Sequence, residues 1–158
     1  MKKLFALLLA CLLLSGCASP APTQPTASPE TTVATQPAVP LTLYLPDDNA
    51  EKLETKEVTV PALSDEAILE QLTLEGVLNQ DVQINTFSAD SPQLAIDFNA
   101  AFGTLVGSMG TAGETMILGS VVNTFLTAYQ GETLKLTVNG SPLETGHSVY
   151  DAPLSFYE

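Results

Sequence analysis

The stretch "GSMGTAGET", residues 107–115, is the part of the sequence that most invites a chemical interpretation. Closely spaced glycines ahead of an apolar helical run are typical of loops that hold a phosphate at a helix N-terminus. Such a loop also needs a cation, commonly a lysine at the head of the helix. Here that place holds Glu114 and Thr115, and no lysine or arginine occurs between Lys56 and Lys135. A carboxylate would repel an anion, so we do not expect a phosphate site.

The same stretch fits the start of a helix. Thr111 and Glu114 have the spacing of a capping box, in which the hydroxyl accepts from a first-turn N–H and the carboxylate bonds back to the cap's own N–H. The apolar periodicity that follows predicts a helix over residues 112–130, with Gly131 at the C′ position. Gly119 lies inside this helix at a cost of about 1 kcal/mol relative to Ala, so we expect a strand to approach it closely.

The other residues that could do chemistry do not form a recognisable set. His147 is the sole histidine and lies in a polar loop, so we interpret it as a surface residue and not as the base of a Ser-His-Asp site. A zinc site would need mostly carboxylates, and the pairs 47–48 and 65–66 lack the spacing of a calcium loop. Paired carboxylates for glycoside hydrolysis stay open, because their separation is spatial. We predict no enzyme activity, no cofactor and no metal.

The N-terminus carries chemistry of another kind. Two lysines precede "LFALLLACLLL", which is too short to span a bilayer comfortably but suits a secretory signal. This run leads into Leu14, Ser15, Gly16 and Cys17, which resemble the bacterial lipobox, where the thiol receives a diacylglyceryl group before cleavage. Residues 1–16 are therefore predicted to be a lipoprotein signal peptide and Cys17 the lipidation site. The alternative is an uncleaved membrane anchor that happens to contain cysteine.

Lipidation predicts attachment to the outer face of the cytoplasmic membrane, since several acyl chains at about 0.8 kcal/mol per methylene anchor a protein durably. Lipoproteins that stay at an inner membrane have an aspartate after the lipidated cysteine, and this chain has Ala18 there. In a cell with two membranes, attachment to the outer membrane is therefore the alternative. Residues 17–40 comprise the lipidated cysteine and a tether rich in Pro, Thr and Ala, which we expect to be disordered. Residues 41–158 are predicted to be one domain without a disulfide, because Cys11 leaves with the signal.

Charge limits the partners. Without Lys2 and Lys3, three lysines face 18 acidic residues, a net charge of −15. Such a body is repelled by nucleic acid and by anionic lipid headgroups, so we expect membrane contact through the lipid anchor only. A basic partner or surface cations would be attracted, although solubility alone also explains the acidity.

Periodicity predicts the folded elements. Alternating apolar residues indicate strands at 40–48 and 56–62, and Ser64 is the expected N-cap of a helix that stops at Gly76. A hairpin over 81–99 should place Leu94, Ile96 and Phe98 inward. A last strand at 133–138 should turn at Asn139-Gly140, and the tail should pack back on the core. The predicted order β-β-α-β-β-α-β indicates an α+β fold, with two helices on one face of a small mixed sheet.

The order of elements, "AIDFNAAF" after the hairpin, "ETMILGSVVNTFLTAY" and "TLKLTVNG" together resemble the GerMN domain of sporulation and spore-germination lipoproteins, over residues 41–157. One departure is that Gly76 is followed by Val77, where the family often has Gly-Pro. The resemblance implies similarity to the wedge-shaped ring-building modules of secretion and sporulation complexes. It supplies no active site.

Two functional hypotheses follow. The first is a non-enzymatic, membrane-anchored interaction module for envelope proteins or for self-association, in sporulation or germination complexes, with Asp97 and Tyr44 as candidate partner contacts. Asp97 has the alternative role of a solvated strand residue or a turn-capping carboxylate. The second hypothesis is a lipoprotein that binds a small ligand or a cell-wall glycan, with a shallow site formed by the following aromatic residues: Tyr44, Tyr129, Tyr150, Phe156 and Tyr157.

Overall fold

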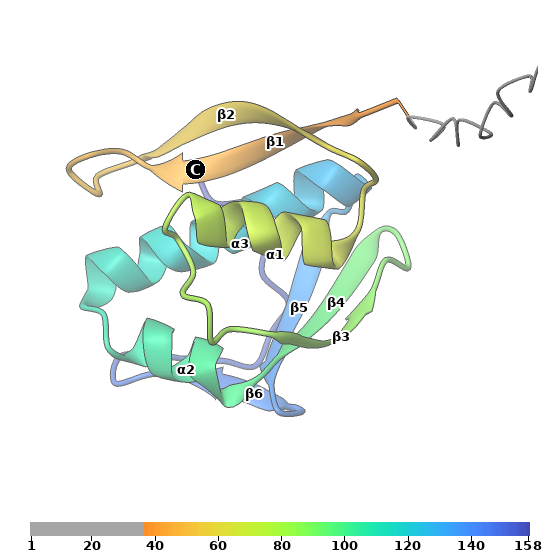
Figure 1. The fold of residues 1–158 in the computed structure, drawn as a ribbon. Helices are drawn as coiled ribbons and strands as arrows, with labels where there is room; N and C mark the ends of the chain where they lie inside the picture. Colours follow the sequence, from red (N-terminus) through yellow and green to blue (C-terminus); the bar gives the residue numbers. More distant parts are fainter. Residues whose placement is uncertain (1–36) are drawn as a thin grey trace, which may run out of the picture. The chain divides into compact units, whose positions relative to one another are not determined.

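The computed structural model describes residues 37–158 (Figure 1). Within this range the elements are β1 (Val39–Pro46), β2 (Leu53–Val60), α1 (Asp65–Leu74), β3 (Ile84–Ser88), β4 (Gln93–Phe98), α2 (Ala100–Gly107), α3 (Thr111–Tyr129), β5 (Thr133–Val138), β6 (Ser141–Glu144) and β7 (Val149–Tyr150). The predicted signal peptide, Leu14, Ser15, Gly16, Cys17 and nearly all of the tether lie outside the described residues. No helix among residues 37–158 combines the length and the apolar character needed to cross a bilayer.

The strands form two sheets where the sequence predicted one. β1 and β2 pair as an antiparallel hairpin, and the remaining strands form a five-stranded sheet in the order β3-β4-β5-β6-β7. β4 and β5 are parallel while the other neighbours are antiparallel, so this sheet is mixed. A parallel pair needs a crossover connection, which α2 and α3 supply. The α+β class with a mixed sheet is confirmed.

Helix α3 is the centre of the core. Every residue from 117 to 126 is buried, including Leu118, Val122 and Phe125. Figure 1 shows α3 between the β1–β2 hairpin and the five-stranded sheet, with α1 beside it. The sequence predicted a helix with one packed face, whereas this helix is covered all round because the hairpin closes its second side. Leu41 and Leu43 of β1 supply that cover.

Helix α2 was not predicted from the sequence. Phe102 and Val106 lie four residues apart on one face of α2 and are fully buried. The ring of Phe102 stacks on that of Phe98, with centroids 4.2 Å apart. Burial of this pair outweighs the helix-breaking tendency of Gly103 and Gly107, which also lie in the helix. The structure therefore has three helices in the described residues where two were expected.

The ends of α1 are as predicted. The hydroxyl of Ser64 accepts from the Ala67 backbone N–H at 3.1 Å, and Gly76 follows the helix with a φ of 78°. The ends of α3 differ from the prediction. Its N-cap is Gly110, no side chain caps it, and the capping box of Thr111 with Glu114 is wrong. At its other end the left-handed residue is Gln130, with a φ of 54°.

Two glycines are required by close packing. A Cβ on Gly119 would lie 2.7 Å from Cδ1 of Leu53 in β2, so the predicted approach of a strand is confirmed. Gly131 follows the C-cap Gln130, as predicted, but it is not the left-handed residue, and a Cβ on it would lie 2.7 Å from Cγ of the fully buried Leu94. The C-terminal tail packs back as expected, since Leu154 exchanges backbone hydrogen bonds of 2.8 Å with Leu134.

Candidate functional site

Asp97 and Tyr44, the two candidate partner contacts, lie in different sheets and share no hydrogen-bond partner. Asp97 is on β4, on the face of the sheet opposite the buried Ile96 and Phe98. Tyr44 is on β1, on the face of the hairpin opposite to the buried Leu43. The structure therefore does not join them into one site.

Asp97 is engaged within the chain. Its Oδ1 accepts from the Thr137 hydroxyl at 2.6 Å and from the Gly140 backbone N–H at 2.7 Å, and its Oδ2 accepts from the Asn85 amide at 2.8 Å. Burial alone would raise the pKa of this carboxyl, but these three hydrogen bonds outweigh it and hold the pKa below its usual value. Asp97 thus fastens the turn between β5 and β6, the capping role that the sequence left open. A partner contact for Asp97 stays a prediction.

Tyr44 belongs to a small aromatic surface with the C-terminal tail. Its ring meets that of Phe156 edge to face, with centroids 5.3 Å apart, and its hydroxyl accepts from Thr127 at 3.2 Å. Phe156 is 48% exposed. Of the other aromatics in the ligand hypothesis, Tyr129 packs on Phe87, Tyr150 bonds to Glu114, and Tyr157 is held through its backbone by Asn123. The predicted five-residue aromatic site is not assembled.

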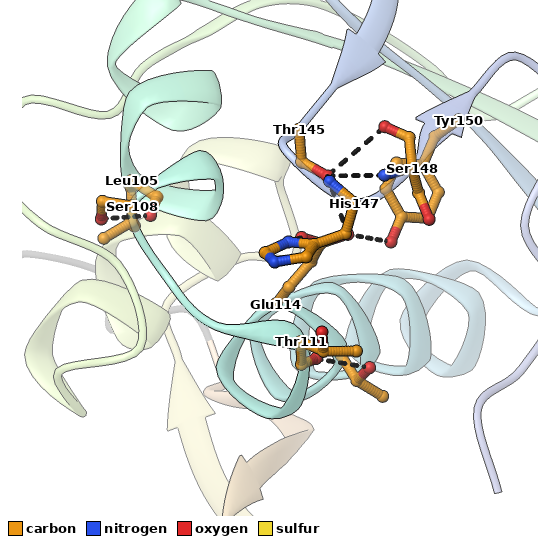
Figure 2. Close-up of polar contacts among 9 residues, drawn as sticks. Leu105, Ser108, Thr111, Glu114, Thr145, His147, Ser148 and Tyr150 are labelled. Carbon is orange, nitrogen blue, oxygen red and sulfur yellow. Dashed lines mark hydrogen bonds and ion pairs between the residues drawn. The ribbon is translucent and has the colours of Figure 1, made fainter.

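A third polar cluster surrounds Glu114 in the first turn of α3 (Figure 2). Glu114 is buried, and its carboxylate bonds to three side chains from β7 and the loop before it. The Tyr150 hydroxyl donates to Oε1, the Thr145 hydroxyl donates to the same oxygen at 3.1 Å, and Nδ1 of His147 lies 3.2 Å from Oε2. Glu114 is therefore a buried anchor for a distant loop, and not the helix cap that its position in the sequence suggested.

Electrostatics keep Glu114 charged. Burial raises the pKa of this carboxyl, but the hydrogen bonds from Tyr150, Thr145 and His147 more than reverse that effect, so its pKa lies below the usual value. The reciprocal effect falls on Tyr150, whose pKa is raised to about 12 by its own desolvation and by the hydrogen bond to Glu114. Because the carboxylate can only accept, Nδ1 of His147 carries the hydrogen of that contact.

The Glu114 cluster resembles two of the three groups of a Ser-His-Asp triad, since a carboxylate orients an imidazole. The imidazole of His147 is 45% exposed, so the surface position predicted for it is correct while its contact with Glu114 was missed. Among the described residues, the hydroxyls bonded to the carboxylate are those of Tyr150 and Thr145, and both donate to it. The arrangement is suited to fixing residues 145–150 against α3. In the part of the chain that the structure describes, no three His, Cys, Asp or Glu side chains gather as metal ligands.

The glycine-rich stretch that opened the sequence analysis starts a helix, as predicted. α3 begins at Thr111, directly after Gly110, and the Thr115 hydroxyl donates to the Thr111 carbonyl at 2.9 Å. No local signal in the sequence reveals the Glu114 cluster, because its partners Thr145 and His147 are more than 30 residues away in the chain.

Comparison with solved structures supports this fold. The first GerMN domain of the sporulation protein GerM from Bacillus subtilis is similar, with a TM-score of 0.54 at 18% identity over 76% of this chain and 98% of that one. The tandem GerMN domains of the same protein give a TM-score of 0.52 at 17% identity, over 76% of this chain and 45% of that one. These identities establish a shared fold alone. Comparison with curated proteins gives no significant match.

A family model gives the stronger result. The model described as "Germane: Sporulation and spore germination" matches residues 42–144, from β1 to the end of β6. That span includes α3, the five-stranded sheet up to β6, and both Asp97 and Glu114. Since the match covers more than half of the sequence, this chain belongs to the Germane family of sporulation and spore-germination domains.

Proposed function

We propose that this protein is a lipid-anchored envelope protein that acts as a non-enzymatic interaction module in the assembly of sporulation or germination complexes. The observation that carries the proposal is the family match over residues 42–144. The predicted lipobox at residues 14–17 and the tether that follows add the anchoring and the reach that such a module requires.

The polar clusters of the structure support binding over catalysis. Asp97 and Glu114 are the carboxylates with the most side-chain hydrogen bonds among the described residues, and each is used to hold a loop or turn. A catalytic carboxylate needs access to a substrate, whereas the Glu114 side chain is 2% exposed. Rigid loops on a compact core are instead what a recognition surface requires.

The proposal is tested in the organism that encodes the chain. Deletion should lower spore formation or germination, the full-length chain should restore it, and a Cys17→Ala chain expressed at the same level should not. A deletion strain that forms and germinates spores normally would contradict the proposed process, and full rescue by Cys17→Ala would contradict the anchoring. Turnover of an envelope polymer by the purified chain, abolished by one acid-to-amide substitution, would contradict the non-enzymatic role.

A further inference from the structure

A groove lies between α1 and the segment that leads to β3. Its apolar lining is Leu69, Leu74 and Val82, and Glu66 and Glu70 of α1 provide its acidic rim. Its volume of about 330 Å³ is at the lower end of the range for binding sites, about 300–1,000 Å³. We refer to these five residues as the α1 groove.

The exposed side chain of Leu74 has no role in the core of the domain. It is 70% exposed, more than any other large apolar side chain that the structure describes. The core-facing stripe of α1 is already complete with Ile68 and Leu72, which are fully buried. Single exposed leucines are common, but Leu74 lies beside the half-buried Leu69 in a groove whose floor includes the buried Val82, and exposed apolar surface in a groove marks interaction sites.

The rim of the groove carries uncompensated negative charge. Glu66 and Glu70 are four residues apart on one helix face, an arrangement that destabilises a helix when both are charged. Of the lysines in the described residues, Lys52 pairs with Glu54 at 2.7 Å and Lys56 pairs with Glu75 at 2.7 Å. Lys135 lies on β5, among the residues of another surface depression.

We infer that the α1 groove receives a basic amphipathic segment of a partner protein, with an apolar side chain on Leu69 and Leu74 and lysine or arginine beside Glu66 and Glu70. This inference rests on the proposed function and adds the face and the chemistry of the partner. Charge complementarity selects this occupant. A second copy would bring the same acidic excess, 18 acidic residues against five lysines in the whole chain, and an anionic membrane surface would be repelled in the same way.

The probes are two synthetic peptides with one leucine face, identical except that one carries lysines and the other glutamates beside that face. The full chain, held by its lipid in phosphatidylcholine nanodiscs, is titrated with each peptide and binding is followed by fluorescence anisotropy. The lysine peptide should bind at least about tenfold more tightly than the glutamate peptide, and its affinity should fall with added salt.

Matched variants distinguish binding in the α1 groove from attraction to the overall negative charge of the chain. Leu74→Ser should weaken the lysine peptide by about tenfold, whereas Val149→Ser, at another exposed apolar residue, should leave it unchanged. The pair Glu66→Lys and Glu70→Lys should reverse the preference toward the glutamate peptide. The pair Glu132→Lys and Glu144→Lys, at two exposed positions elsewhere, makes the same change in net charge and should keep the original preference.

The inference is overturned if neither peptide binds, if both bind equally, or if the control variants lose as much affinity as the groove variants. Circular dichroism of each variant shows that the fold is retained. If deletion of the chain still impairs sporulation or germination, these outcomes contradict the groove and not the proposed function. The partner would then bind another face of the domain. Dimerisation of the chain that is abolished by Leu74→Ser would instead identify a second copy as the occupant and would also overturn the inference.

Discussion

His147 and Glu114 are joined across 33 residues of sequence, with Nδ1 of the imidazole 3.2 Å from Oε2 of the carboxylate. One partner is half-exposed in a loop and the other is buried in the first turn of the central helix. Together with the pairing of β7 on β6, this contact holds residues 145–150 against α3. Glu114 is thus the polar centre that fixes residues 145–150.

Substitution of Glu114 by Gln should destabilise the protein by about 1–3 kcal/mol at neutral pH, because the charged acceptor of the Tyr150 and Thr145 hydroxyls becomes a neutral one and the new amide N–H faces Nδ1 of His147. Urea unfolding of the two chains measures the difference, and Glu132→Gln at an exposed position is the control. The folded-state pKa of Glu114 is below its usual 4.5, so its stabilising effect is complete above that value and is lost as the pH falls through the folded pKa. A difference that is the same at pH 7 and at strongly acidic pH would contradict this role.

Tyr150 gives the opposite dependence on pH. Its pKa is raised from 10.0 to about 12, so its hydrogen bond to Glu114 contributes stability below pH 10 that is lost as the pH rises toward 12. Tyr150→Phe should therefore lower the free energy of unfolding at neutral pH, and the difference from the original chain should shrink in strong alkali. Tyr44→Phe serves as the comparison, because the Tyr44 hydroxyl only accepts a 3.2 Å bond from Thr127 at the surface. Equal pH profiles for the two variants would refute the assignment.

Asn123 should control the C-terminal tail. Its amide donates to the Tyr157 carbonyl at 2.9 Å and its carbonyl accepts from the Tyr157 N–H at 2.8 Å, from a side chain that is 1% exposed. Asn123→Ala leaves both backbone groups without partners, so we expect a loss of about 1–3 kcal/mol. Hydrogen exchange should accelerate at residues 154–158 before it does so in β4. Asn49→Ala, in the exposed turn of the hairpin, should change neither quantity.

The end of α3 offers two substitutions of opposite sign. Gln130→Gly should stabilise the protein by about 1 kcal/mol, because the residue has a φ of 54°, which costs a side-chain-bearing residue that much. Gly131→Ala should destabilise it by about 1–3 kcal/mol, because the added Cβ meets Leu94. Thermal unfolding of the two variants distinguishes them. Stabilisation by Gly131→Ala would contradict the close packing of this position against Leu94.

Local patterns in the sequence predicted most of the elements. Alternation located the strands around Leu43 and Ile96, Ser64 and Gly76 marked the ends of α1, and Asn139-Gly140 marked a turn. These features depend on neighbours in sequence, which is why they could be read from the chain alone.

Features that depend on distant partners were missed. Glu114 was interpreted as a cap because its spacing from Thr111 is local, while its true partners lie more than 30 residues on. α2 was missed because its stability comes from the stacking of Phe102 on Phe98 and not from helix propensity. The separate β1–β2 hairpin covers the second face of α3. The periodicity of neither segment predicts that the two pack together.

The most direct test of the central claim, that this chain works by binding other envelope proteins, is crosslinking in intact cells as they form or germinate spores. The account predicts that the full-length chain is joined to one or more defined envelope proteins, and that the same adducts are lost when Cys17→Ala removes the proposed lipidation site. Recovery of the chain without any protein adduct at either stage would contradict it.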